Sequence, residues 1–152
     1  MEKDLEVFLE VVDALIDYTM ERDVRDAVTR EIQKKVQTEV YDKYPDPIRY
    51  ERKMGRRGLQ DDREVPDGSM ETHYDSKIKL LTVEDVRKDW EPTHKPEGRN
   101  VAEVVESGEG YDYKDIGPRP FHKKAEEALI KTKEVDKILT KAMKDNLGAW
   151  SL

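Results

Sequence analysis

The chain of 152 residues contains no cysteine. Disulfides, thiolate metal sites and cysteine nucleophiles are therefore excluded together. Long apolar runs are absent as well, since no stretch approaches the roughly 20 residues that a helix needs to cross a bilayer. The chain opens Met1-Glu2-Lys3-Asp4, without the basic segment and apolar run of a secretory leader. These absences predict a soluble, unprocessed protein that folds in the cytosol.

Motifs for nucleotide binding and catalysis are also missing. The glycines form neither GxxxxGK[ST] nor GxGxxG, and no serine lies in a nucleophile elbow. The histidines, His73, His94 and His122, have no partner at the spacing of helical zinc ligands. Asp61 and Asp62 are adjacent, so in a strand they would point to opposite faces and could not act as an acid–base pair. We expect no enzyme activity, no metal and no cofactor.

Apolar residues are scarce relative to charged ones. They make up 36% of the chain, whereas Asp, Glu, Lys and Arg make up 41%. Such a chain has much surface and little core, which favours an elongated protein or an oligomer. The formal net charge of −7 argues against nucleic-acid binding over the whole surface, because phosphate contacts need a basic face. A local basic patch is compatible with that balance.

Helical periodicity marks the N-terminal part of the chain. Apolar residues recur every three or four positions over residues 4–20 and again, as a narrower stripe, over residues 24–40. Asp23 could cap a separate second helix, or the two segments could run on as one bent helix. We favour two helices with a break near residues 21–23. The prolines of Tyr44-Pro45-Asp46-Pro47 then end the helical region.

A single long helix is predicted at the C-terminal end. Its lead-in is Gly117-Pro118-Arg119-Pro120-Phe121, and Pro120 is placed to open the helix. One apolar stripe continues to Leu147, and Gly148 is expected to end the helix as a left-handed cap. His122, next to two lysines, is expected on the helix surface.

The middle of the chain predicts a small sheet. Residues 59–65 are expected to form a short strand, and the alternation over residues 70–81 predicts one amphipathic strand. Residues 101–105 fit either a strand or a helical turn. The whole predicts an α+β fold, in which N-terminal helices and a long C-terminal helix pack on a small antiparallel sheet with long loops. We expect one domain over residues 1–152, divided into a helical region (4–42), a basic loop and short strand (43–69), strands and loops (70–116) and the C-terminal helix (119–147).

One predicted loop is strongly basic. Residues 48–58 read IRYERKMGRRG. A charge run of this kind is usually a solvated loop, and the alternative is a contact arm for an acidic partner or nucleic acid. Interfaces concentrate arginine and aromatic residues. The candidate interface residues are therefore Arg49, Tyr50, Arg52, Arg56, Arg57, Trp90, Tyr111 and Tyr113. The candidate structural residues, which would set the angle of the last helix, are Pro118, Arg119, Pro120 and Phe121.

Three stretches stand out, in this order: EVYDKYPDPIRYERKMGRRGL at 39–59, NVAEVVESGEGYDY at 100–113 and GPRPFHKKAEEAL at 117–129. Together they resemble a family of tailed-bacteriophage minor tail proteins, the head–tail joining or tail-completion proteins of phages and prophages of Firmicutes. In that family a long helix ends in a turn with tyrosine and proline before an arginine-rich loop, and Pro-Arg-Pro-Phe opens the last helix. The resemblance covers roughly residues 24–147, with His122 where an acidic or apolar residue is usual.

This resemblance implies a structural virion protein that forms a homo-oligomeric ring, expected to be hexameric, at the top of the tail tube. Its partners would be further copies of itself, a neck or head-completion protein, and a tail-tube or tail-terminator protein. No membrane and no small-molecule substrate are expected. The protein would lie in the neck or upper tail of the virion, and in the host cytoplasm during assembly.

Ring contacts are heterologous, so each chain needs two different patches. The loop between Arg49 and Arg57 and the acidic first helix are our candidates, because their charges are opposite. The alternative function is a small regulatory or nucleic-acid-associated protein that acts through the same loop.

Overall fold

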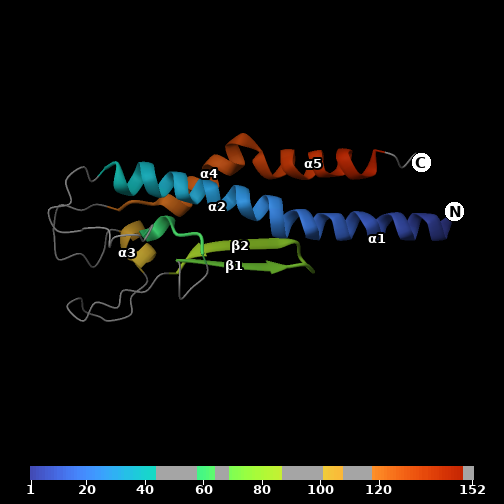
Figure 1. Cartoon of the computed structure of the whole chain (residues 1–152), viewed down its shortest axis with the longest axis horizontal. Helices are drawn as coiled ribbons and strands as arrows, with labels where there is room; N and C mark the ends of the chain where they lie inside the picture. The colour runs from blue at the N-terminus through green and yellow to red at the C-terminus, as the bar shows by residue number, and fades with distance from the viewer. Residues whose placement is uncertain (44–57, 64–68, 87–100, 108–117, 149–152) are drawn as a thin grey trace.

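The protein is elongated and built in three layers (Figure 1). The computed structural model describes residues 1–43, 58–63, 69–86, 101–107 and 118–148. An N-terminal helix runs through the middle, the C-terminal helices cover one side of it, and a two-stranded hairpin lies on the other side (Figure 1). The α+β fold class is confirmed.

The N-terminal helix is continuous. It comprises α1 (Glu2–Thr19), a π-helical turn η1 (Met20–Val24), α2 (Arg25–Lys35) and a second π-helical turn η2 (Val36–Tyr41). Thr19, Met20, Val24 and Arg25 all have right-handed helical backbone angles. The favoured break near residues 21–23 is therefore wrong, and the single continuous helix is right. Each π turn accommodates an extra residue, which rotates the apolar stripe and keeps it on the core.

The sheet is a hairpin of β1 (Met70–Asp75) and β2 (Leu80–Asp85). The strands are antiparallel, with Met70 opposite Asp85 and Asp75 opposite Leu80. The single strand predicted over residues 70–81 is wrong, because the chain reverses at residues 76–79. In this turn the Asp75 carboxylate accepts the N–H of Lys77 at 2.9 Å, and Lys79 adopts a left-handed φ of 55°.

Two shorter segments bear on the predictions for residues 59–65 and 101–105. Residues Gly58–Gln60 form a 3-10 turn, η3, where a strand was predicted to begin. That strand is wrong over the part of its range that the structure describes. Val101–Ser107 forms the helix α3, so the helical alternative for residues 101–105 is right.

Two helices replace the single C-terminal helix that the periodicity predicts. They are α4 (Phe121–Thr132) and α5 (Glu134–Leu147), and Lys133 between them is left-handed at φ 52°, ψ 39°. Gly148 has right-handed angles, so its predicted left-handed cap is wrong. The left-handed residue that ends a helix is Lys133 instead.

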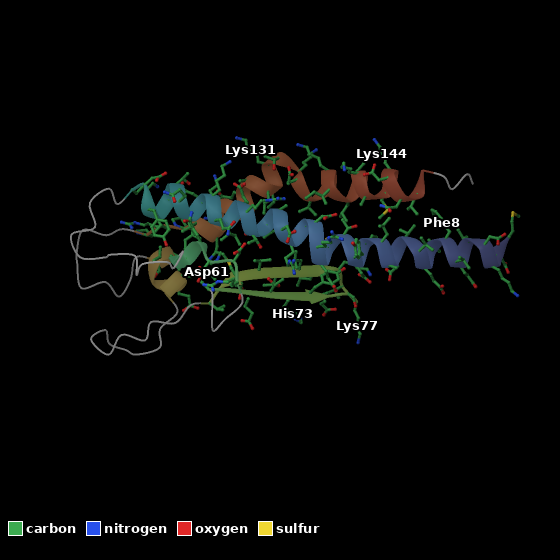
Figure 2. All side chains as sticks on the ribbon, viewed as in Figure 1. Phe8, Asp61, His73, Lys77, Lys131 and Lys144 are labelled. Carbon is green, nitrogen blue, oxygen red and sulfur yellow. The ribbon has the colours of Figure 1, made fainter. Side chains whose placement is uncertain are left out.

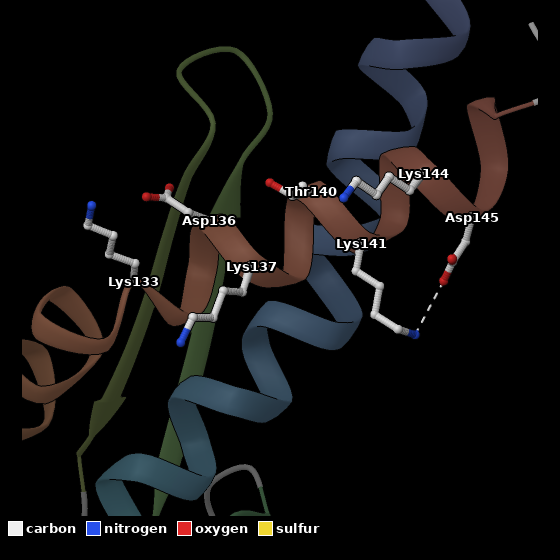
Figure 3. Close-up of a pocket in the computed structure, with 7 residues that line it drawn as sticks. All are labelled: Lys133, Asp136, Lys137, Thr140, Lys141, Lys144 and Asp145. Carbon is white, nitrogen blue, oxygen red and sulfur yellow. Dashed lines mark ion pairs between the residues drawn. The ribbon is translucent and has the colours of Figure 1, made fainter.

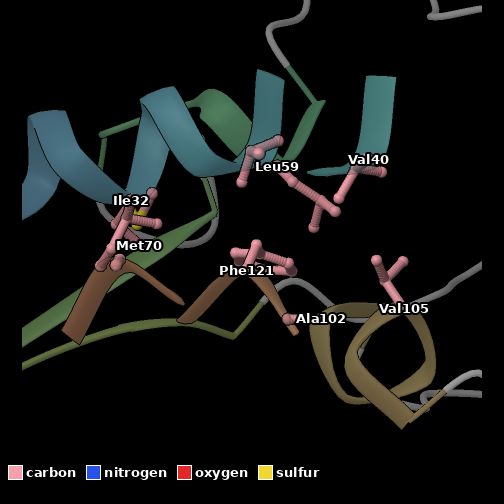
Figure 4. Close-up of a cluster of buried hydrophobic side chains, with 9 residues drawn as sticks. Ile32, Val40, Leu59, Met70, Ala102, Val105 and Phe121 are labelled. Carbon is pink, nitrogen blue, oxygen red and sulfur yellow. The ribbon is translucent and has the colours of Figure 1, made fainter. Parts of the chain in front are cut away.

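The core lies at one end of the molecule. Val36 and Phe121 are fully buried in it. Phe121 lies between Leu59 of η3 and Ala102 of α3 (Figure 4). The C-terminal helices lie mainly against the N-terminal helix rather than against the sheet: α4 packs on α2, and α5 on α1. The sheet reaches the N-terminal helix chiefly through β2 and α2. Among the described residues, none of the helices combines the length and apolar character needed to cross a membrane. The buried core cluster comprises Ile32, Val36, Val40, Leu59, Met70, Ala102, Val105, Phe121 and Ala125.

Candidate functional site

The candidate interface residues chosen from the sequence lie outside the described part of the chain. Their assignment to an interface therefore stays a prediction. These residues are Arg49, Tyr50, Arg52, Arg56, Arg57, Trp90, Tyr111 and Tyr113.

The Pro118–Phe121 lead-in is described, and it positions the start of α4. The Arg119 N–H donates to the carbonyl of Val105 in α3 at 2.9 Å. Pro120, at φ −77° and ψ 68°, forms an inverse γ-turn in which the Phe121 N–H donates to the Arg119 carbonyl at 2.8 Å. The Pro120 carbonyl then accepts the first helical hydrogen bond, from Lys124, at 3.0 Å. The two prolines thus direct the Phe121 ring, which is 0% exposed, into the core.

His122 bridges three elements instead of lying on the helix surface. Its Nε2 accepts the backbone N–H of Asp85 at the end of β2 at 3.2 Å. Its Nδ1 lies 3.1 Å from Oε1 of Glu106 in α3, and the same carboxylate accepts its backbone N–H. This geometry requires a neutral imidazole with the proton on Nδ1. Burial lowers the pKa of His122 to about 4 and raises the pKa of Glu106, which the His122 backbone N–H opposes.

A cluster of charged side chains and one tyrosine connects the tip of the hairpin to α1. The Lys79 ammonium lies 2.7 Å from a carboxylate oxygen of both Asp13 and Asp17. The Tyr74 hydroxyl donates to Asp17 at 2.6 Å. Hydrogen bonds from Lys79 and Tyr74 lower the pKa of Asp17, while burial and Asp17 raise the pKa of Tyr74 to about 12. The left-handed conformation of Lys79 directs this side chain from the turn onto the helix.

The other groups singled out from the sequence do not converge. Asp61 is buried and accepts the Arg63 guanidinium at 2.9 and 2.6 Å, whereas Asp62 is exposed. His73 is exposed on β1, and His94 lies outside the described residues. Within the described ranges, no group of three His, Asp or Glu side chains could hold a metal ion.

A pair of charged helices, α1 and α5, forms a surface feature that we call the arm. The two helices run in opposite directions, and the arm extends beyond the hairpin, so that Phe8 lies past the hairpin tip at Lys77 (Figures 1 and 2). None of the residues of α5 is fully buried, and the buried residue of α1 is Thr19 at its end. Large apolar side chains are exposed along α1, with Leu9 at 55% and Val7 at 51%.

The two helices of the arm carry opposite charges on their outer faces. Between Glu2 and Thr19, α1 has six acidic residues and one lysine. Along α5 a shallow hollow of about 420 Å³ is lined mainly by lysines (Figure 3). All the residues that line it belong to α5 or directly precede it, so it is an open groove between side chains of one helix. The acidic stripe is Glu2, Glu6, Glu10, Asp13 and Asp17; the lysine stripe is Lys133, Lys137, Lys141 and Lys144.

The acidic character of the first helix is visible in the sequence, and we expected a patch there. The lysine stripe was missed, although its signal was present: four lysines recur at steps of four, four and three residues. His122 was misplaced, because nothing in its sequence neighbourhood indicates contacts with Asp85 and Glu106.

Comparison with known proteins identifies the family. The model of the YomN family matches residues 3–147. The chain belongs to the YomN family. A curated relative, "SPbeta prophage-derived uncharacterized protein YomN" of Bacillus subtilis (strain 168), is 28% identical over 153 residues, which cover 97% of this chain and 92% of the relative.

These relations support a phage or prophage origin for the chain. Neither the family name nor the name of the relative states a role in head–tail joining. No solved structure matches the chain.

Proposed function

We propose that the protein is a structural component of a phage particle, which joins the head and neck to the tail by forming a ring at the top of the tail tube. The observation that carries this proposal is the match to the YomN family over nearly the whole chain, together with a relative that derives from a prophage. The ordered Tyr-Pro, Arg-rich and Pro-Arg-Pro-Phe segments support the more specific role at the head–tail junction.

The shape of the molecule is compatible with this role. A ring subunit needs two different surfaces, one for each neighbour. The core lies at one end of the molecule, and the arm presents exposed apolar side chains and two stripes of opposite charge. Such a subunit has enough exposed surface to contact neighbouring copies, a neck protein and a tail-tube protein.

The proposal is tested in the phage that encodes the protein. We expect purified particles to contain it, and gold-labelled antibodies to mark the junction of head and tail. Deletion of its gene is expected to leave filled heads and separate tails, which purified protein added to the lysate then joins. The matched control is the same deletion complemented by the gene in trans.

Complete, infectious particles from the deletion strain would reject the proposal. If the protein instead bound DNA with an affinity that fell steeply with salt, the alternative role through the loop between Arg49 and Arg57 would be favoured.

A further inference from the structure

The strongest unexplained feature is the pair of oppositely charged stripes on the arm. We infer that the acidic stripe of α1 in one copy docks on the lysine stripe of α5 in a second copy of this chain. This contact deepens the proposed function and rests on it, because it names the surfaces through which copies of the chain would meet in the ring. It can be tested with the purified chain, without a phage particle.

The acidic stripe is unbalanced within one chain. Asp13 and Asp17 are paired with Lys79, but Glu2, Glu6 and Glu10 form no ion pair among the described residues. They follow one another at four-residue steps, and like charges at this spacing destabilise a helix. A cationic partner along this face would remove the repulsion.

The lysine stripe has the complementary imbalance. Lys137 and Lys144 are exposed and form no ion pair with the described residues, while Lys141 pairs only with exposed Asp145, at 3.2 Å. Lys133 and Lys137 lie at the N-terminal end of α5, where the helix dipole disfavours positive charge. The stripe therefore weakens the isolated helix, and an anionic partner would reverse that effect.

Apolar surface lies beside the acidic stripe. Leu9 is 55% exposed on one side of it, and Val7 and Tyr18 are 51% and 55% exposed on the other. Lysine side chains have aliphatic stems that cover apolar surface while the ammonium group meets a carboxylate. The lysine stripe of a second copy could thus cover this apolar surface and pair with the carboxylates in a single contact.

The two stripes face different directions. On a helix with about 3.6 residues per turn, the acidic stripe of α1 lies roughly a third of a turn from the half-buried apolar residues of that helix. The lysine stripe lies on the face of α5 opposite its half-buried residues, and so points away from α1. One copy can therefore offer each stripe to a different neighbour, which is the heterologous contact that builds rings or filaments.

A second copy is the occupant that fits both stripes at once. A polyanion would cover the lysines and leave the acidic stripe unpaired, and a basic partner would do the reverse. Each chain carries both halves of the complementary pair, so a second copy needs no further component.

The experiment exchanges charges between the stripes. Glu6→Lys/Glu10→Lys reverses two charges of the acidic stripe, and Lys137→Glu/Lys144→Glu reverses two charges of the lysine stripe. Matched controls reverse as many charges on α4, with Glu126→Lys/Glu127→Lys and Lys123→Glu/Lys131→Glu, all at exposed positions. Sedimentation measures self-association up to about 100 μM, a range that detects weak contacts, and far-UV circular dichroism checks helix content.

We expect the wild-type protein and both α4 controls to self-associate, at least about tenfold more weakly at 0.5 M than at 0.05 M salt. Each stripe variant alone should remain monomeric. An equimolar mixture of the two stripe variants should associate again, because the new lysines on α1 of one variant meet the new glutamates on α5 of the other. This restoration also shows that both variants are folded.

Three results would overturn the inference. They are a monomeric wild-type protein at all concentrations, stripe variants that associate like the wild type, and a mixture that does not associate. A fifth variant, Arg52→Glu/Arg56→Glu/Arg57→Glu, tests the predicted basic loop. Loss of association in this variant, with association kept in Lys137→Glu/Lys144→Glu, would also overturn the inference. None of these results bears on whether the protein is found in phage particles.

Discussion

Oε1 of Glu106 lies 3.1 Å from Nδ1 of His122 and also accepts the backbone N–H of the same residue. One carboxylate oxygen of α3 thus receives two donors from the first turn of α4. A carboxylate in this position caps the helix from another element and complements its dipole. Because Nε2 of the same imidazole accepts the Asp85 N–H, the contact also fixes the end of β2. The neutral imidazole therefore holds three elements together.

This arrangement predicts a loss of stability in mild acid. Burial lowers the pKa of His122 from 6.5 to about 4 in the folded protein. Between these pH values the unfolded chain binds more protons than the folded one, so the free energy of unfolding falls as the pH drops from 6.5 to 4 and levels off below. The loss is about 3 kcal/mol at most. Protonation of Glu106, whose pKa burial raises, partly offsets it near the lower end of this window.

Urea unfolding at a series of pH values measures this effect. His122→Gln should flatten the profile between pH 6.5 and 4, whereas His73→Gln, at an exposed histidine of β1, should leave it unchanged. Equal profiles for the two variants would show that His122 does not carry the pH dependence.

We expect the Phe121 side chain to contribute more to the stability of the core than any other single side chain. It is 0% exposed and belongs to the cluster that joins α2, η2, α3 and β1. Phe121→Ala should lower the free energy of unfolding by about 3–5 kcal/mol. Ile130→Ala, on the same helix but 68% exposed, should change it by less than about 0.5 kcal/mol. If denaturant titrations gave similar losses of unfolding free energy for both variants, Phe121 would not be a main contributor to the stability of the core.

The Lys79 ammonium should stabilise the hairpin against α1. Lys79→Met keeps the stem but removes both ion pairs, leaving Asp13 and Asp17 without their cation, and should lower the free energy of unfolding at low salt. High salt should shrink this difference, since it screens exposed charges. Lys77→Met, in the same turn and exposed, serves as the control. A cost that does not depend on salt, or that both variants share, would argue against an electrostatic contact.

The helices could be predicted from the sequence because their signal is local. Apolar residues at three- and four-residue steps mark both the first helix and the last two, whatever they pack against. The hairpin turn could not be predicted in this way, because alternation continues through residues 76–79 and the turn contains neither glycine nor proline. Its reversal depends on the Asp75 side chain and on a left-handed Lys79, which ion pairs to α1 hold in place.

The contacts of His122 could not be predicted from local sequence patterns either. Glu106 is 16 residues away and Asp85 is 37 residues away along the chain. Lys123 and Lys124 beside it indicate an exposed position, and only the packing of α4 against α3 and the end of β2 buries the imidazole. The acidic stripe, by contrast, is a property of one helix and could be predicted.

The break between α4 and α5 gives a last prediction. Lys133 is left-handed, a conformation that costs a lysine roughly 1 kcal/mol or more and a glycine very little. Lys133→Gly should therefore raise the free energy of unfolding by up to about 1 kcal/mol. The matched control is Lys131→Gly, an exposed position inside α4, where glycine should lower it by about 0.5–1 kcal/mol. Opposite signs in thermal or urea unfolding would support the break at Lys133, whereas equal losses would mean that one helix runs through residue 133 and that the lysine stripe continues onto α4.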